Sequence, residues 1–233
     1  MDPEHLKRWR SAERKRLLAA RLALDAVALE RLRNVIDTHL ERAFPGLSGR
    51  VVAFCWPIQN EYDARHLARR LRARGARTAL PVVVAPRTPL AFRLWIPGDQ
   101  LAQGALGIPY PAAGEVVVPT VALVPMNGFD ALGYRLGYGG GFFDRTLAAL
   151  AAQGNKPVAI GVAYEAARIE TIHPQDYDVP MDYVVTERGV YERRDGKLEF
   201  LAASGATAPA SGYSSPACEA HLIASDYFGK PDR

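Results

Sequence analysis

A glycine-rich stretch, residues 133–145, is the feature that most limits how this chain can fold. Five of its thirteen residues are glycine. A short apolar run at 117–125 precedes it, and a helical pattern at 146–152 follows directly. A strand, a glycine loop and a helix start bring backbone N–H groups close to a bound anion, because glycine permits close approach and the helix N-terminus carries partial positive charge. The stretch therefore predicts a polyphosphate site.

Charged residues inside the stretch support this interpretation. Arg135 and Arg145 supply positive charge, and Asp144 could hold a divalent cation between phosphate oxygens. The alternative is a long glycine-rich turn whose Phe142 and Phe143 pack into the core. The glycine spacing matches neither a dinucleotide-binding fingerprint nor a P-loop. Both common nucleotide motifs are therefore excluded, and a more particular kind of site is required.

Length and charge bound the organisation of the chain. Its 233 residues suit one globular domain, which we assign to residues 1–201. Residues 202–233 are rich in Ala, Ser, Gly and Pro, which predicts a flexible C-terminal tail, although its few apolar residues could dock somewhere. The net charge of +4 is modest and mostly interspersed, so we expect no nucleic-acid partner.

The cysteines and the apolar runs indicate the compartment. Cys55 and Cys218 are too few and too far apart for a disulfide framework or a zinc site. The N-terminus lacks the apolar core of a signal peptide, and no run approaches the ~18 apolar residues of a membrane span. We therefore expect a cytoplasmic protein, monomeric and without a membrane partner.

Helical and extended patterns alternate along the chain. Residues 5–43 show helical periodicity, with Asp25 as the predicted N-cap of a second helix, Ala26–Ala43. This alternation predicts an α/β fold: a three-layer, mainly parallel doubly wound sheet with N-terminal helices and a C-terminal β-hairpin. Such sheets bind ligands beyond the carboxyl ends of their strands, where the glycine loop, residues 57–61 and the segment from Tyr164 fall. Strands are expected at 50–56, 78–84, 89–95, 116–124, 157–163 and 183–186, further helices at 61–74 and after the glycine loop, and the hairpin at 190–193 and 197–201.

Residues 123–145, Leu-Val-Pro-Met-Asn-Gly-Phe-Asp-Ala-Leu-Gly-Tyr-Arg-Leu-Gly-Tyr-Gly-Gly-Gly-Phe-Phe-Asp-Arg, closely resemble the signature of 5-formyltetrahydrofolate cyclo-ligases. Glu-Tyr-Asp at 61–63, Ala-Leu-Pro-Val at 79–82, Gly-Ile-Pro at 107–109 and the segment 178–187 follow the family in the same order. The resemblance covers about residues 6–200. It implies that ATP and Mg²⁺ activate the formyl oxygen of 5-formyltetrahydrofolate as a phosphate, after which N10 closes the 5,10-methenyl ring.

The resemblance also implies roles for individual residues. Glu61 and Asp63 have an alternative role as caps of the following helix. By resemblance, the catalytic residues are Arg135, Tyr138 and Asp144. The ATP-binding residues are Arg10, Arg14, Arg135, Leu136, Gly137, Tyr138, Gly139, Gly140, Gly141, Phe142 and Phe143. Reduced folate is expected at Ile58, Glu61 and Asp63, and Mg²⁺ at Asp144 and Asp178.

Several positions depart from the family pattern. Ala167 stands where the family often has glutamine, and Tyr177 where it has histidine. Phe142 and Phe143 replace two tyrosines, and Tyr110 replaces a frequent glutamate. The phosphate cradle is thus intact while the substrate-facing residues have changed. This pattern leaves open a divergent paralogue that binds nucleotide, folate or both, with another substrate or without catalysis.

Overall fold

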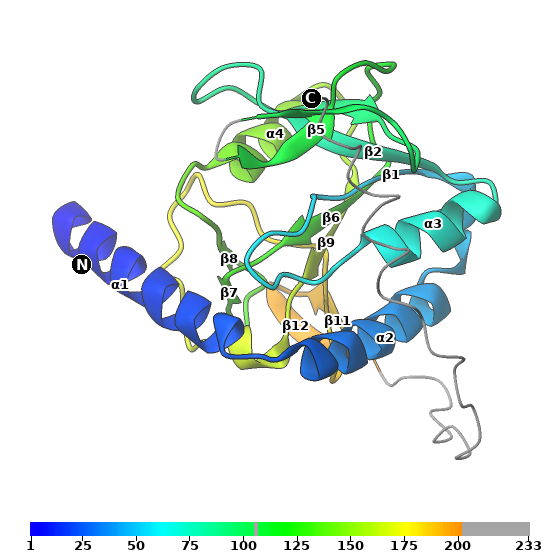
Figure 1. Cartoon of the computed structure of the whole chain (residues 1–233). Helices are drawn as coiled ribbons and strands as arrows, with labels where there is room; N and C mark the ends of the chain where they lie inside the picture. The colour runs from blue at the N-terminus through cyan, green and yellow to red at the C-terminus, as the bar shows by residue number, and fades with distance from the viewer. Residues whose placement is uncertain (105–106, 202–233) are drawn as a thin grey trace, which may run out of the picture.

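The computed structural model of the chain describes residues 1–104 and 107–201 (Figure 1). The predicted C-terminal tail, 202–233, lies outside the described residues. Within the described ranges, none of the helices combines the length and the apolar character needed to cross a membrane.

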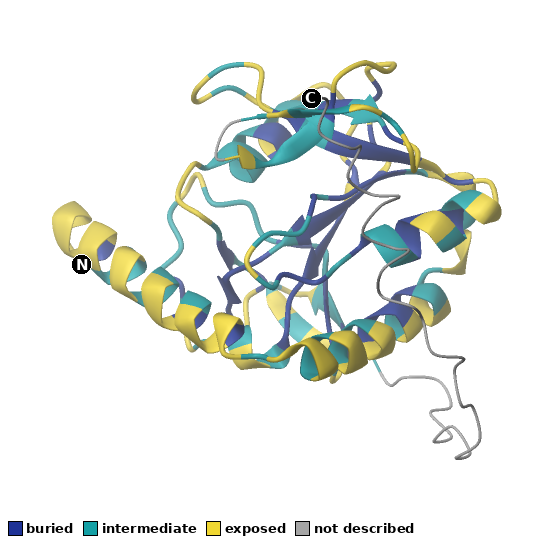
Figure 2. Cartoon of the chain, viewed as in Figure 1, coloured by how far each residue is buried: buried dark blue, intermediate teal, exposed yellow. Residues whose placement is uncertain are grey.

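Two helices begin the chain, as predicted. Helix α1 spans Pro3–Leu22 and α2 spans Ala26–Ala43, followed by the short 3-10 helix η1, Pro45–Gly49. The side chain of Asp25 accepts a hydrogen bond from the backbone N–H of Ala28 at 2.7 Å, which confirms the predicted N-cap. Figure 2 shows α1 exposed along its outer side and partly buried along the side that faces the rest of the molecule.

The central sheet of the described residues has eight strands in the order β12-β11-β10-β9-β6-β1-β2-β3. The five strands from β10 to β2 are parallel, β3 joins one edge antiparallel, and the hairpin β11–β12 extends the other. This arrangement confirms the predicted mainly parallel sheet and C-terminal hairpin. The strands are β1 Val51–Ala53, β2 Arg77–Val82, β3 Ala91–Leu94, β6 Val121–Pro125, β9 Val158–Val162, β10 Tyr183–Thr186, β11 Gly189–Arg194 and β12 Lys197–Leu201.

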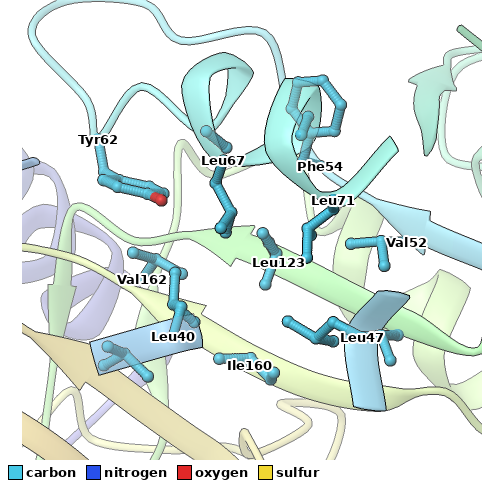
Figure 3. Packing of buried hydrophobic residues seen from close by; sticks show 14 of the residues in the cluster. Leu40, Leu47, Val52, Phe54, Tyr62, Leu67, Leu71, Leu123, Ile160 and Val162 are labelled. Carbon is cyan, nitrogen blue, oxygen red and sulfur yellow. The ribbon is translucent and has the colours of Figure 1, made fainter. Parts of the chain in front are cut away.

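Alternating side chains of the sheet pack on two separate cores. In β6, Leu123 joins the core beneath α2 and α3 (Arg65–Ala73), whereas Val124 joins the core beneath α4 (Phe142–Ala152). Figure 3 shows the first core, where Leu40 and Leu67 from the helices lie against the sheet. Because side chains alternate along a strand, the same short strands bury both faces, which produces the three predicted layers.

The boundaries differ from the predicted ones in several places. The helix expected from residue 61 begins only at Arg65, because Gln59 and Asn60 have positive φ and the turn from Ile58 to Glu61 delays it. The glycine loop is also shorter than the predicted stretch 133–145, because Arg135–Leu136 form a strand and α4 already begins at Phe142. Two small ribbons were missed: β7 Gly128–Phe129 pairs with β8 Arg135–Leu136, and β4 Leu101–Gln103 pairs with β5 Pro109–Pro111.

Candidate functional site

The glycine loop occupies residues 137–141, between β8 and the first turn of α4. Gly139 and Gly141 have φ of 95° and 63°, a left-handed region that side chains with a Cβ rarely adopt, so glycine is required there. Gly141 is the N-cap of α4, and no side chain caps the free N–H groups of the first turn. Residues 138–140 are exposed. The loop therefore presents open backbone amides at a helix N-terminus, as the sequence predicted for an anion site.

Two arginines brace this loop. Arg14 reaches from α1, and its Nε donates to the carbonyl oxygen of Gly137 at 2.6 Å. Burial, helped by the charge of Arg10, lowers the pKa of Arg14. Arg145 donates to the carbonyl oxygen of Gly140, and its guanidinium lies 5.6 Å from the ring centroid of Phe142. Positive charge thus lies on two sides of the exposed amides.

Arg135, which sits beside the loop, is buried against Asp144. Its Nη2 lies 2.7 Å from Asp144 Oδ1, and its Nη1 donates to the carbonyl oxygen of Val179 at 2.6 Å. The backbone N–H of Val179 donates to the same Asp144 oxygen at 3.0 Å. Burial lowers the pKa of Arg135, while the charges of Asp144 and Asp178 act in the opposite direction. The guanidinium therefore lies in the field of both predicted metal ligands.

Asp178 is paired with Arg10. The shorter of its contacts joins Arg10 Nη2 to Asp178 Oδ2 at 2.6 Å, and both side chains are largely buried, at 11% and 9% exposure. The backbone N–H of Gln175 donates to the same oxygen at 2.8 Å. Each of the two predicted metal carboxylates therefore already has an arginine partner.

The two carboxylates fit a cation that is shared with phosphate. No cluster of three or more His, Cys, Asp or Glu side chains suited to a metal ion occurs among the described residues. Mg²⁺ keeps several waters and commonly binds one or two carboxylates together with substrate phosphates. Asp144 and Asp178 match that donor set, and the exposed loop amides lie at the start of the helix that carries Asp144.

Glu61 is the centre of a second, adjoining region. It is buried, with 8% exposure, and its Oε1 accepts a hydrogen bond from the hydroxyl of Tyr138 at 2.7 Å. Its Oε2 accepts from the backbone N–H of Ile58 at 3.1 Å. Burial raises the pKa of Glu61, although the bonds from Tyr138 and Ile58 and the charge of Arg21 oppose the rise. A carboxylate held in this way is well placed to recognise a polar edge of a ligand.

Tyr138 connects this region to the glycine loop. Its hydroxyl also accepts a hydrogen bond from Arg21 Nη2 at 2.8 Å, and Arg21 Nε donates to the carbonyl oxygen of Gln59 at 2.8 Å. Arg21, Tyr138 and Glu61 therefore form one chain of hydrogen bonds. Tyr138, from the predicted phosphate cradle, is its middle member, and Glu61, a predicted folate residue, is one of its ends.

A pocket opens beside Glu61, beyond the carboxyl ends of β6 and β9. Leu17 and Arg21 of α1 form one side. Asn127 follows β6, Tyr164 follows β9, and Ala167 belongs to η3, Glu165–Ala167. The walls are mostly apolar with a few polar groups, as in many small-molecule sites. Ala167, singled out by its departure from the family pattern, lies within this wall.

The other predicted substrate residues lie apart from the pocket wall. Ile58 contributes its backbone N–H to Glu61. Asp63 is bound by Arg65, with Nη2 to Oδ2 at 2.7 Å. Burial would raise the pKa of Asp63, but the hydrogen bonds and charge of Arg65 outweigh it, and the net shift is downward. Asp63 also accepts from the backbone N–H of Arg65 at 3.0 Å, which agrees with the alternative that it organises the helix start.

The aromatic and apolar members of the predicted ATP set differ in burial. Leu136 is buried and packs in a small core with Leu17 and Ile172, so its side chain is not available to a phosphate. Phe143 packs partly against the core beneath α4, as the turn interpretation expected, whereas Phe142 lies against Arg145. Tyr177 is 68% exposed.

Sequence reasoning missed two residues of the site, Arg21 and Asn127. Arg21 is not among the residues predicted for the site, but it is buried, with 9% exposure. Its spacing carried the signal, since it follows Leu17 by four residues and Arg14 by seven, which puts all three on one helix face. Asn127 is buried at 4% exposure, and a polar residue directly after the apolar strand was its only signal.

The sequence is similar to those of one enzyme family. A model of the 5-formyltetrahydrofolate cyclo-ligase family matches residues 6–187. A 5-formyltetrahydrofolate cyclo-ligase of Escherichia coli K12 is 32% identical over 154 residues, covering 64% of this chain and 84% of the relative. The corresponding protein of Haemophilus influenzae is 27% identical over 168 residues, covering 69% and 88%.

Solved structures show the same fold. The NMR structure of the Aquifex aeolicus 5,10-methenyltetrahydrofolate synthetase superposes with a TM-score of 0.68 at 30% identity, covering 81% of this chain and 94% of that one. A 5,10-methenyltetrahydrofolate synthetase from Mycoplasma pneumoniae has a TM-score of 0.62 at 23% identity, covering 76% and 98%.

Proposed function

Because the chain belongs to the 5-formyltetrahydrofolate cyclo-ligase family, we propose that it converts 5-formyltetrahydrofolate to 5,10-methenyltetrahydrofolate with consumption of ATP in the presence of Mg²⁺. The observation that carries the proposal is the contact between Tyr138 and Glu61. It joins an exposed amide cradle suited to phosphates with the mostly apolar pocket that Glu61 lines. A reaction that phosphorylates one substrate with another requires these two sites to adjoin.

The residues of the cradle would position the nucleotide. The amides of residues 138–141 and the guanidinium groups of Arg14 and Arg145 would bind phosphate oxygens. Asp144 and Asp178 would hold Mg²⁺, which neutralises phosphate charge when bound. Arg135, buried and oriented by Asp144 and the carbonyl of Val179, would direct its charge toward the transferred phosphoryl group.

The pocket would hold the reduced folate. Glu61 would accept N–H groups of the bicyclic head, and the apolar wall would exclude water from the reacting atoms. The formyl oxygen then attacks the γ-phosphorus and ADP leaves. N10 attacks the activated carbon and loses its proton, and the phosphate departs with the original formyl oxygen. This sequence needs positioning and charge neutralisation, and no nucleophile from the protein.

The test is the absorbance of the methenyl-folate band in a mixture of the protein, 5-formyltetrahydrofolate and MgATP. We expect a rise that requires both substrates and is absent in Asp144→Asn, a change that keeps the side-chain shape and removes its charge. Glu115→Gln is the matched control, because its ion pair with Arg77 is exposed. Arg77 belongs to strand β2, and Glu115 lies in the segment before β6. No rise in the wild-type protein, with both substrates shown to bind, would overturn the proposal.

A further inference from the structure

Asn127 lines the pocket and carries a buried hydrogen-bonding atom that no described residue uses. The residue is 4% exposed, and its Oδ1 has no hydrogen-bond partner among the described residues. Buried polar atoms in folded proteins are nearly always paired, because an unpaired one loses its bonds to water without replacement. An unpaired amide oxygen in a residue that lines a pocket therefore indicates a partner on the ligand side, which the oxygen would reach when the amide turns toward the pocket.

Two other buried atoms without partners have different surroundings. Arg168 Nη2 belongs to a guanidinium that pairs with Glu165 and lies over Phe129 and Tyr191. Arg145 Nε belongs to a side chain that already contacts Gly140. Neither residue lines the pocket beside Glu61, whereas Asn127 does.

The backbone around Asn127 is held in place, so only its side-chain torsions can turn the amide toward a partner. Its own N–H donates to the carbonyl oxygen of Leu136 at 3.0 Å. The neighbouring Met126 is buried. On the other side, a Cβ on Gly128 would lie 2.7 Å from Leu17 Cδ1, so the chain is pressed against α1. The residue is thus held in the wall, and its unpaired oxygen costs stability that a bound ligand would recover once the terminal torsion turns the amide toward it.

We propose that Asn127 is a specificity-determining residue that accepts a hydrogen bond from an N–H group of the folate head. This inference rests on the proposed function and deepens it. Glu61 supplies a charged acceptor and Asn127 a neutral one on the same pocket, so together they select a heterocycle with N–H donors on more than one edge. A purely apolar ring of equal size would leave the Asn127 acceptor unpaired.

The decisive variant is Asn127→Leu, which has similar volume and no polar atom. The dissociation constant for 5-formyltetrahydrofolate, measured without nucleotide, should rise about threefold to tenfold, the usual worth of one neutral hydrogen bond. The KM for folate should rise similarly while the KM for MgATP stays unchanged. The ligand-free variant should melt no lower than the wild type, because an unpaired acceptor has been removed. Asn155→Leu, beyond the end of α4 and outside the pocket wall, is the control.

A second variant separates the amide from the shape of the site. Ala167 lies on the same wall, so Ala167→Gln added to Asn127→Leu should recover part of the lost folate affinity. Unchanged folate affinity in Asn127→Leu, with wild-type binding and turnover intact, would overturn this inference alone. A wild-type protein that binds no 5-formyltetrahydrofolate would overturn both the inference and the proposed function.

Discussion

Replacing Asp144 with alanine should damage stability and turnover together, and the structure sets the size of the first effect. The ion pair with Arg135 is largely buried, with side-chain exposures of 4% for Arg135 and 21% for Asp144. Removing one partner of a buried pair leaves an uncompensated charge and typically costs about 3–5 kcal/mol. Because Asp144 is partly exposed, we expect the lower end, about 3 kcal/mol, or roughly 6–12 °C in melting temperature for a protein of this size.

Thermal melts of three variants test this reasoning. Asp144→Asn can still accept from Arg135 and from the N–H of Val179, so its melting temperature should fall much less than that of Asp144→Ala, while both lose turnover in the methenyl-folate assay. Glu115→Ala breaks an exposed pair, with exposures of 48% and 62%, and should cost at most about 1 kcal/mol. The burial argument fails if Asp144→Ala and Glu115→Ala melt alike, and the metal assignment fails if Asp144→Asn turns over normally.

Three further predictions concern the cradle and the pocket. Because burial raises the pKa of Glu61, the native protein keeps that proton at pH values where the unfolded chain has lost it, so this site's stability contribution falls as pH rises from about 4.5 through the native pKa. Thermal melts between pH 4 and 8 should therefore show Glu61→Gln gaining stability relative to the wild type as the pH increases. The variant should bind folate weakly. Parallel curves of melting temperature against pH for the two proteins would contradict this prediction. Tyr138→Phe removes a hydrogen bond that lowers the Glu61 pKa, so the pH midpoint of folate binding should move upward, and an unmoved midpoint would rule out the coupling. Arg14→Ala should weaken MgATP binding about tenfold or more, as loss of a charged hydrogen bond does, without changing folate affinity in calorimetry; equal losses for both ligands would point to a structural role instead.

Local signals predicted much of the fold. Asp25 precedes a run of helix formers and caps α2 as expected, because its carboxylate satisfies a free N–H of the first turn. Asp195-Gly196 supplies the positive φ values that the tight turn between β11 and β12 demands. The parallel order followed from the alternation of strands and helices, since parallel neighbours need a crossover. The pairing of Arg135 with Asp144 brings together two residues that the sequence had already assigned to one site.

The remaining features depend on long-range contacts that a local pattern does not contain. The two-residue strands β7 and β8 are too short for periodicity, and they form because Gly128 and Leu136 meet across an irregular loop. Arg21 looks like other arginines of the first helix in the sequence, because its partners Gln59 and Tyr138 come from two separate loops far along the chain. The turn with positive φ that precedes α3 decides which carboxylates of residues 57–63 line the pocket. The helical periodicity from residue 61 gave no sign of that turn.

The pairing of Arg135 with Asp144 and of Arg10 with Asp178 has a thermodynamic consequence for the proposed reaction. A metal ion that draws one carboxylate away exposes a buried arginine without a counter-charge, and a nucleotide phosphate that draws the arginine away leaves the carboxylate in the same condition. Each ligand alone meets this penalty, whereas the two arriving together cancel it. Affinity for Mg²⁺ and affinity for ATP must then rise together by the same factor, since linkage between two sites is reciprocal. The ion pairs of the ligand-free site would thus make it bind the metal–nucleotide complex tightly and either component alone weakly.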